Sequence, residues 1–465
     1  MSQKAMKNRR SPLCRLACGI AVFLAPLGLL AQPALAQSSD RLDESKRHIA
    51  SEAEAIDLVW SGQRVNAQMI QRGEHQFVAY FDASRQMSVA HRSSSRSPWR
   101  FHKVGSFVGW DSHNYVTVDV DEDGYIHLLG NMHADRLVYF RSRYPWDVRS
   151  LEQIDYMVDA ERETRVTYPR FLRDRDGQLI AIFRIGSSGN GKYYYHKYDT
   201  GTRTWALMHD KQFFDGEGER GAYYIDPVQG PDGKFHTVWV WRETPSAATN
   251  NNLSYVRSAD LINWEDSNGR PVALPIIRST GEIVDPIPIF SGLLNGQTRL
   301  GFDPEGLPMI SYYKHDANGD TQIMLARKAG TGWSIHQISD WTNSRQSLDR
   351  GGSLNVSILV PAAPYMADDG TIRVRAVRDG KFIEFVVDEA TNGLLSTGSF
   401  LPHPPQIADF HTNKDLTQYI LPADGVPDDS EYRYFISWEA KPPNQDLARS
   451  DIPAPSILRV HKIAR

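Results

Sequence analysis

Residues 116–130 read VTVDVDEDGYIHLLG, two short apolar runs joined by an Asp123-Gly124 turn. An Asp-Gly pair between runs rich in Val, Ile, Tyr and Phe is the strongest local signal for a β-hairpin. Similar Asp-Gly or Glu-Gly pairs recur along the chain, with their glycines at Gly177, Gly233, Gly306 and Gly370. Successive glycines are 53, 56, 73 and 64 residues apart, and a period of this size indicates blades or solenoid turns.

A second periodic feature favours blades, because each turn strand is followed by another strand that ends near a tryptophan. These tryptophans are Trp99, Trp146, Trp205, Trp264 and Trp333. Five clear units, a weaker one near Gly73 and one assembled from the two chain ends make seven. In the last unit, strands at 432–440 and 457–463 would pair with the N-terminal part and so remove exposed sheet edges.

We therefore predict an all-β fold, a seven-bladed β-propeller of four-stranded antiparallel blades. No Pro/Gly/Ser linker divides the chain, so residues 37–465 are expected to form a single catalytic domain. An array of two-sheet sandwiches is the competing architecture.

The first 36 residues have the pattern of an export signal. Five basic residues precede an apolar stretch from about residue 16 to residue 30, and Ala34-Leu35-Ala36 is a small-residue cleavage site. We therefore expect residues 1–36 to be a cleaved signal peptide and the mature protein to be secreted or periplasmic. Both cysteines, Cys14 and Cys18, would leave with it, so no disulfide or thiolate chemistry is expected.

The charge of the mature chain argues against general nucleic-acid binding. Loss of the five basic residues leaves 47 Lys and Arg against 56 Asp and Glu, a net charge of −9. Proteins that bind nucleic acids generally have a basic surface instead. No later segment is long and apolar enough to cross a membrane. An anionic polysaccharide remains a suitable partner if a local basic groove is present, and we expect a monomer.

The turn glycines also locate side chains along each hairpin. Residues at similar distances from their turn glycines are expected to reach one rim of the ring. They are Tyr115, Tyr168 and Tyr224 (nine before the glycine), His113 (eleven before), Arg184 (seven after), and His133, Arg242 and His315 (nine after). Positions that differ by two share a face of a strand, so consecutive blades deliver His, Tyr and Arg to a common canyon. His127 and His236, three residues past their glycines, are interpreted as packing residues between blades.

Four segments carry a resemblance to a known family. They are DSHNY (111–115), GNMH (130–133), TYPR (167–170) and FRIG (183–186). They resemble active-site segments of the seven-bladed propeller ulvan lyases, within a wider similarity to secreted proteins with BNR-type repeats. The resemblance covers most of the mature chain and rests on the spacing of His113 to His133 and of Tyr168 to Arg184.

The resemblance implies a polysaccharide lyase that cleaves ulvan, a sulfated rhamnose-uronic acid polysaccharide, by β-elimination at the uronic acid. In that family's chemistry, Arg184 would neutralise the uronate carboxylate and His133 would assist. Either His113 or Tyr168 would remove the C5 proton, and Tyr168 would protonate the departing O4. Tyr224, Arg242 and Asn114 are the expected substrate contacts.

Two other functions fit parts of the sequence. A glycoside hydrolase on the same propeller, either a rhamnosidase or sialidase-like, would need acidic residues that form no clear pair here. A non-catalytic carbohydrate-binding propeller would not need two titratable groups beside an arginine.

Metal binding is left open. No cofactor is expected to be required for catalysis, because an arginine can neutralise the carboxylate. A structural divalent cation, Ca²⁺ or Zn²⁺, is possible. The acidic turn at residues 119–123 has oxygen ligands suited to Ca²⁺, although a solvated turn is the simpler interpretation.

Overall fold

The computed structural model describes residues 52–349, 354, 356–408 and 410–465. The described residues belong to one compact unit, and the predicted signal peptide lies outside them. Strands dominate this unit; its short helix α1 spans Pro405–Ala408. None of the helices in the described part of the chain is long and apolar enough to cross a membrane.

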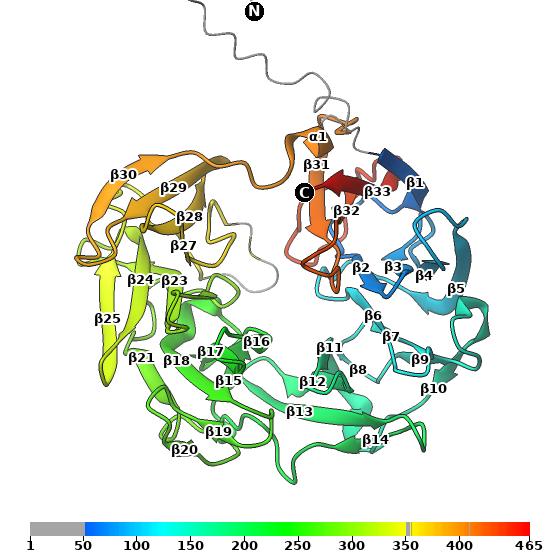
Figure 1. Ribbon diagram of the computed structural model, residues 1–465, viewed down its shortest axis with the longest axis horizontal. Coiled ribbons are helices and arrows are strands. Elements are labelled where there is room, and N and C mark those ends of the chain that lie inside the picture. The colour runs from blue at the N-terminus through cyan, green and yellow to red at the C-terminus, as the bar shows by residue number, and fades with distance from the viewer. Residues whose placement is uncertain (1–51, 350–353, 355, 409) are drawn as a thin grey trace, which may run out of the picture. The chain divides into compact units, whose positions relative to one another are not determined.

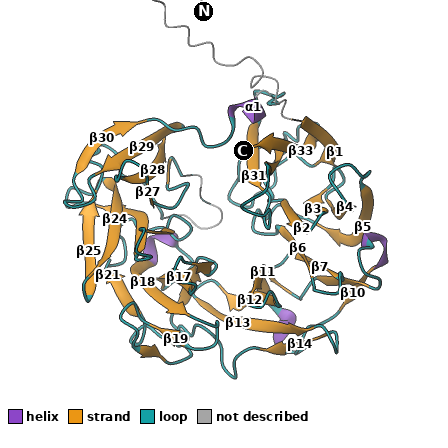
Figure 2. Cartoon of the chain, in the orientation of Figure 1, coloured by secondary structure: helices purple, strands orange, loops and turns teal. Residues whose placement is uncertain are grey.

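The described strands form seven antiparallel sheets arranged as successive blades around a centre (Figures 1 and 2). The predicted seven-bladed propeller is therefore confirmed. Blade 1 comprises β2 (Gln68–Arg72), β3 (His75–Phe81), β4 (Gln86–Arg92) and β5 (Arg100–Phe107). Blade 2 comprises β6 (Val116–Val120), β7 (Ile126–Gly130), β9 (Tyr139–Ser142) and β10 (Leu151–Ile154). Blade 3 comprises β8 (His133–Asp135), β11 (Val166–Arg173), β12 (Leu179–Ser187), β13 (Asn190–Asp199) and β14 (Thr204–Leu207).

Blades 3, 4 and 6 carry small additions to the four-stranded plan, whereas blade 5 keeps four strands. Blade 4 comprises β15 (Gly221–Tyr224), β16 (Val228–Gln229), β17 (Phe235–Arg242), β18 (Asn250–Ser258), β19 (Trp264–Glu265), β20 (Pro271–Val272) and β21 (Glu282–Asp285). Blade 5 comprises β22 (Arg299–Phe302), β23 (Pro308–His315), β24 (Thr321–Ala329) and β25 (Gly332–Gln337). Blade 6 comprises β26 (Ile358–Leu359), β27 (Tyr365–Met366), β28 (Ile372–Arg378), β29 (Lys381–Val387) and β30 (Leu394–Gly398).

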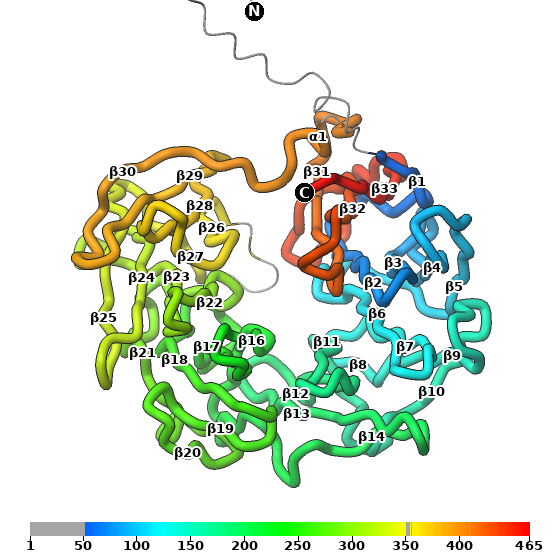
Figure 3. Tube along the Cα trace, viewed as in Figure 1, coloured from blue at the N-terminus to red at the C-terminus, as the bar shows by residue number. Residues whose placement is uncertain are grey.

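Blade 7 joins the two ends of the chain. It comprises β31 (Thr417–Pro422), β32 (Tyr432–Ala440), β33 (Ser456–Ala464) and β1 (Glu52–Val59). The N-terminal strand β1 pairs antiparallel with the C-terminal strand β33, from Glu52 opposite Lys462 to Val59 opposite Ser456 (Figure 3). The predicted pairing of the chain ends is confirmed, and one of the two C-terminal strands has the predicted bounds.

The turn glycines behave as the sequence requires. All five, from Gly124 to Gly370, have φ between +75° and +88°, a conformation that costs glycine little. His127 and His236 are fully buried and hydrogen-bond the hydroxyls of Tyr139 and Tyr255. The interpretation of these two histidines as packing residues is confirmed.

Candidate active site

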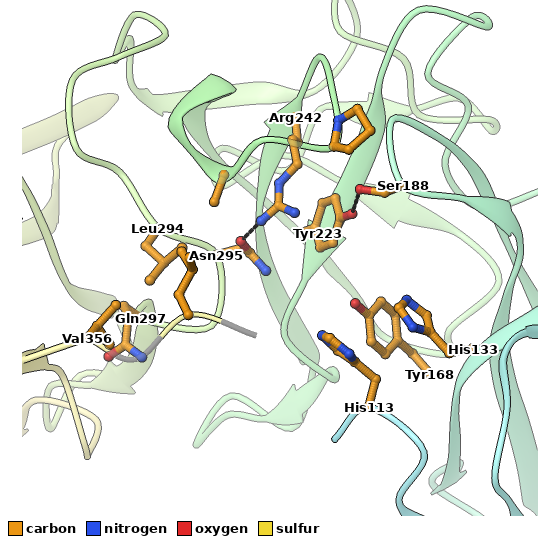
Figure 4. A pocket seen from close by; sticks show the side chains of 13 residues that line it. His113, His133, Tyr168, Ser188, Tyr223, Arg242, Leu294, Asn295, Gln297 and Val356 are labelled. Atoms are coloured by element: carbon orange, nitrogen blue, oxygen red, sulfur yellow. Dashed lines mark hydrogen bonds between the residues drawn. The ribbon is translucent and has the colours of Figure 1, made fainter. Parts of the chain in front are cut away.

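Most of the predicted catalytic residues line one cavity of about 410 Å³ (Figure 4). The residues that line it are His113, His133, Tyr168, Ser188, Tyr223, Arg242, Pro245, Ala247, Leu294, Asn295, Gln297, Leu354 and Val356. Blades 2 to 4 contribute the polar and titratable side chains, and the apolar part of the lining consists of Pro245, Ala247, Leu294, Leu354 and Val356. None of the described lining residues is an Asp or a Glu.

Asp111 holds the two histidines together. Its Oδ1 lies 2.6 Å from Nδ1 of His113, and its Oδ2 hydrogen-bonds Nδ1 of His133. The imidazole rings lie 4.4 Å apart, centre to centre. With Nδ1–H donated to the carboxylate, each ring keeps Nε2 as a proton acceptor. Burial works against the charge of Asp111, but the hydrogen bonds from His113 and His133 hold the pKa of its carboxyl well below the usual value.

Tyr168 reaches the cavity through a local distortion of β11. The pairing of β11 with β12 shifts between Thr167 and Arg170, and Tyr168 has φ of +57°. A left-handed tyrosine directly before a proline is costly, and such strain at a β-bulge re-aims a side chain. The Tyr168 ring lies 6.0 Å from His113 and 6.1 Å from His133. Burial raises the pKa of the Tyr168 phenol, and Arg184 only partly offsets this.

Arg184 does not line the cavity. Its side chain is 1% exposed, and its guanidinium carbon lies 4.7 Å from the centre of the Tyr168 ring. Nη1 donates a long hydrogen bond of 3.4 Å to the Tyr223 hydroxyl, and Nε has no partner among the described residues. The carboxylate partner that a buried arginine would favour is also absent from the described residues. Arg184 therefore supplies positive charge from behind two tyrosines.

Arg242 is the cation that faces the cavity. Nε donates to Asn250 Oδ1 at 2.9 Å, and Nη2 hydrogen-bonds Asn295 Oδ1. Its guanidinium carbon lies 4.1 Å from the centre of the Tyr223 ring. Ser188 Oγ lies 2.5 Å from the Tyr223 hydroxyl. Burial opposes ionisation of Tyr223, but Arg242 and Arg184 together lower the pKa of its phenol.

Two predicted substrate contacts lie away from the cavity. The Tyr224 ring packs against Tyr193 at 4.7 Å and Phe214 at 5.5 Å, so the residue beside it, Tyr223, takes the cavity position. Tyr168 and Tyr224 lie equally far before their turn glycines, yet only the Tyr168 side chain reaches the cavity. The reason is that β11 carries a bulge, whereas the inner strand of blade 4 is split into β15 and β16. Asn114 is half-buried, and its backbone N–H donates to Asp111 O at 3.2 Å.

The remaining residues counted to the rim play other parts. Tyr115 is buried and donates to Pro169 O at 3.1 Å, and His315 is half-buried against the glycine of a neighbouring loop, Gly292. The rim count did not include Asp111, Tyr223 or Ser188. The sequence could have indicated Asp111, because it lies two residues before His113 in the DSHNY segment.

Asp111, His113 and His133 also form the one group of three or more potential metal ligands in the described part of the chain. Their ligand atoms lie within 4.8 Å of one another, and two imidazoles and a carboxylate are ligands that suit Zn²⁺. In the acidic turn, by contrast, Asp119 accepts hydrogen bonds from Arg72 and Arg173, and Asp121 accepts backbone N–H groups of the turn. A structural cation, and catalysis without a cofactor, stay predictions.

Comparison with known proteins identifies relatives of this site and fold. A model of the family described as BNR repeat-containing family member matches residues 75–341. The chain is 25% identical over 234 residues to the short isoform of ulvan lyase from Alteromonas sp. (strain LOR), which covers 39% of this chain and 43% of that protein. It is 25% identical over 143 residues to the long isoform from Pseudoalteromonas sp. (strain PLSV), covering 29% and 14%. The chain thus matches less than half the length of these curated relatives.

Solved structures resemble the whole propeller. The polysaccharide lyase Uly1 superposes with a TM-score of 0.61 at 14% identity, over 86% of this chain and 90% of that one. A PL25 ulvan lyase bound to -[GlcA(1-4)Rha3S]- superposes with a TM-score of 0.58 at 12% identity, over 89% and 96%. At such identities the likeness concerns the fold, and it supports the propeller architecture.

Proposed function

This chain belongs to the BNR repeat-containing family, and from that premise we propose that it is a polysaccharide lyase that cleaves ulvan by β-elimination at the uronic acid. One observation carries the proposal: Asp111 holds His113 and His133 beside Tyr168 at a cavity that contains one cationic side chain, Arg242, among its described lining residues. Base, acid and carboxylate-binding groups, which an elimination needs, therefore lie around one space.

Arg242 is the group proposed to bind the uronate carboxylate. A planar guanidinium can hold both carboxylate oxygens, and neutralising them makes the C5 proton more acidic. The sequence resemblance gives this task to Arg184, but Arg184 is buried behind Tyr168 and Tyr223. We therefore assign Arg184 to stabilising the tyrosines and Arg242 to the substrate.

His113 is proposed as the base and Tyr168 as the acid. Nε2 of His113 takes the C5 proton, the C4–C5 double bond forms, and the C4–O4 bond breaks as the Tyr168 hydroxyl protonates O4. Burial raises the pKa of the Tyr168 phenol, which keeps it protonated and suits it to donate. The proton on His113 then returns to the Tyr168 phenolate through solvent, restoring both groups for the next turnover.

The hydrolase alternative has less support from the cavity. Most glycosidases use two carboxyl groups flanking the bond that they cleave, whereas the described lining residues include no Asp or Glu. Asp111 contacts two of the lining residues, and its two oxygens are engaged by these histidines.

Ultraviolet absorbance during incubation with ulvan tests the proposal, because elimination creates an unsaturated uronate and hydrolysis does not. Absorbance should rise with the unmodified chain and stay flat with His113→Ala and Tyr168→Phe. The matched controls His102→Ala, in the outer strand β5, and Tyr144→Phe, which is 56% exposed, should behave as the unmodified chain. Reducing sugar released without absorbance would instead establish a hydrolase, and ulvan binding without either product a binding propeller.

The remaining proposals concern the protein in its setting. Residues 1–36 would direct export, so the polysaccharide would be met outside the cytoplasm by the mature chain acting as a monomer. N-terminal sequencing of the exported protein should give a start near Gln37, and size-exclusion chromatography should give the mass of one chain.

A further inference from the structure

The loop between β21 and β22, residues 286–298, forms the rim of the cavity and exposes an aromatic ring. Leu294 and Asn295 of this loop line the cavity, yet Phe290, four residues earlier, is 59% exposed. A single exposed apolar residue needs no explanation by itself. Phe290, however, also has φ of +63°, a left-handed conformation that aromatic residues rarely adopt and that costs free energy.

Four contacts hold the loop in this shape. The Phe290 N–H donates to Ala248 O at 2.7 Å, and the His315 N–H donates to Ser291 O at 2.8 Å. The buried Asn250 side chain donates to Leu293 O at 3.1 Å. Gly292 lies so close to His315 that an added Cβ would stand 2.3 Å from its ring. The strained aromatic is therefore a fixed part of the loop.

The backbone of Phe290 lies next to the apolar residues of the cavity lining. Its backbone partner Ala248 is adjacent to Ala247, which lines the cavity together with Pro245 and Leu294. His113, His133 and Tyr168 lie across the cavity from Leu294 (Figure 4). A polysaccharide whose uronate lies between His113 and Arg242 can therefore continue along the apolar wall toward Phe290.

We propose that Phe290 is a stacking platform for a sugar ring of the same polysaccharide, outside the cavity in which the bond is cleaved. One face of a pyranose carries mainly C–H groups, and such a face packs against an aromatic ring. This inference rests on the proposed function and extends it, because a platform beyond the cavity makes the enzyme prefer long chains over short ones.

Phe290→Gly is the variant that tests the platform without endangering the fold, because glycine accepts the left-handed backbone that phenylalanine strains. We expect KM for ulvan polymer to rise about three- to tenfold, in keeping with the loss of one aromatic contact. The effect should fall on KM rather than kcat, and it should be smaller for the shortest oligosaccharide that is still cleaved. Phe290→Tyr should restore the low KM, and Phe101→Ala, at a phenylalanine 42% exposed on β5, should leave KM unchanged.

Binding without chemistry separates this inference from the proposed function. Electrophoresis through gels containing ulvan should retard His113→Ala, and adding Phe290→Gly to that chain should weaken the retardation. Equal retardation of the two chains would overturn the platform while leaving the lyase intact. No retardation of His113→Ala, with no turnover by the unmodified chain, would overturn both.

Discussion

The carboxylate of Asp111 lies 2.6 Å from Nδ1 of His113, two residues further along the same loop. The other carboxylate oxygen hydrogen-bonds Nδ1 of His133, so one acid fixes both rings with Nε2 free to accept a proton. This carboxylate stays ionised at neutral pH, because the two histidines hold its pKa well below the usual value against the cost of burial. The Asp111 carboxylate therefore remains a hydrogen-bond acceptor for both rings at neutral pH.

Asp111→Asn should abolish most of the activity while preserving the shape of the site. An amide cannot stabilise an imidazolium as a carboxylate does, and its NH₂ cannot accept from Nδ1–H. We expect kcat on ulvan to fall by about 100-fold or more, the range of general acid–base catalysis. Asp446→Asn is the matched control, since Asp446 Oδ2 lies 3.7 Å from His113 Nδ1, and it should cost much less. Equal losses in the two variants would contradict the role given to Asp111.

Arg184→Met should separate activity from stability. Arg184 is buried without a salt bridge to a described carboxylate, and a buried charge without a partner costs free energy that methionine does not incur. We therefore expect Tm to stay level or rise while kcat falls.

The pH profile of the same variant has a defined sign. Arg184 lowers the pKa of the Tyr168 phenol, so its removal raises that pKa further. A tyrosine that acts as an acid loses activity when it deprotonates, and the alkaline end of the rate profile should therefore move to higher pH. A movement to lower pH would show that Arg184 does not act on Tyr168.

Arg242→Gln, at the cavity surface, should instead raise KM.

Gly191→Ala tests whether activity depends on the position of the Arg184 side chain. A Cβ on Gly191 would stand 2.3 Å from Cδ of Arg184, in a space that the buried guanidinium stem already fills. Overpacking of this kind costs about 1–3 kcal/mol of unfolding free energy and displaces the side chain. We expect a lower Tm in thermal unfolding and a lower kcat. Gly105→Ala, at a site with no atoms within 4 Å of the added Cβ, is the control and should change neither.

Much of the fold could be predicted because its signals are local. Each Asp-Gly turn is encoded by adjacent residues, and β32 begins and ends at the predicted Tyr432 and Ala440. The convergence of His113, His133 and Tyr168 on one cavity followed from the blade period. The direction of individual side chains did not, because it depends on irregularities that a count from the turn ignores. The bulge at Tyr168 and the interruption after Tyr224 are such irregularities. At the interruption, Tyr223 lines the cavity where Tyr224 was predicted.

The partners of Arg184 were equally hidden from the sequence. Its position in the apolar run at residues 181–185 indicates burial, and the cost of a buried charge favours a carboxylate or a ligand anion beside it. The structure surrounds the guanidinium with tyrosine rings instead, an arrangement that requires residues from blades 3 and 4 together. The structure places Arg242, and not Arg184, among the described residues that line the cavity.

His196 gives the stability of the propeller a defined pH dependence. It is 1% exposed, stacks on Phe183 at 4.2 Å, and burial lowers its pKa to about 3. The unfolded chain binds a proton at this residue below about pH 6.5, whereas the folded chain does not until about pH 3. Between these values the unfolded state binds more protons, so stability falls as the pH falls, by about 1.4 kcal/mol per pH unit for one such histidine.

Thermal unfolding from pH 7.5 to pH 5 measures this contribution. His91 and His461, also buried, have pKa values lowered by burial to about 4 and add to the decline. His196→Gln cannot titrate, so its Tm should start lower at pH 7.5, through lost packing, yet decline less steeply than that of the unmodified chain. Tyr144→Phe, at an exposed ring, should keep the original slope. Identical slopes for His196→Gln and the unmodified chain would mean that His196 titrates alike in the folded and unfolded chains, because only a pKa that differs between the two states makes stability depend on pH.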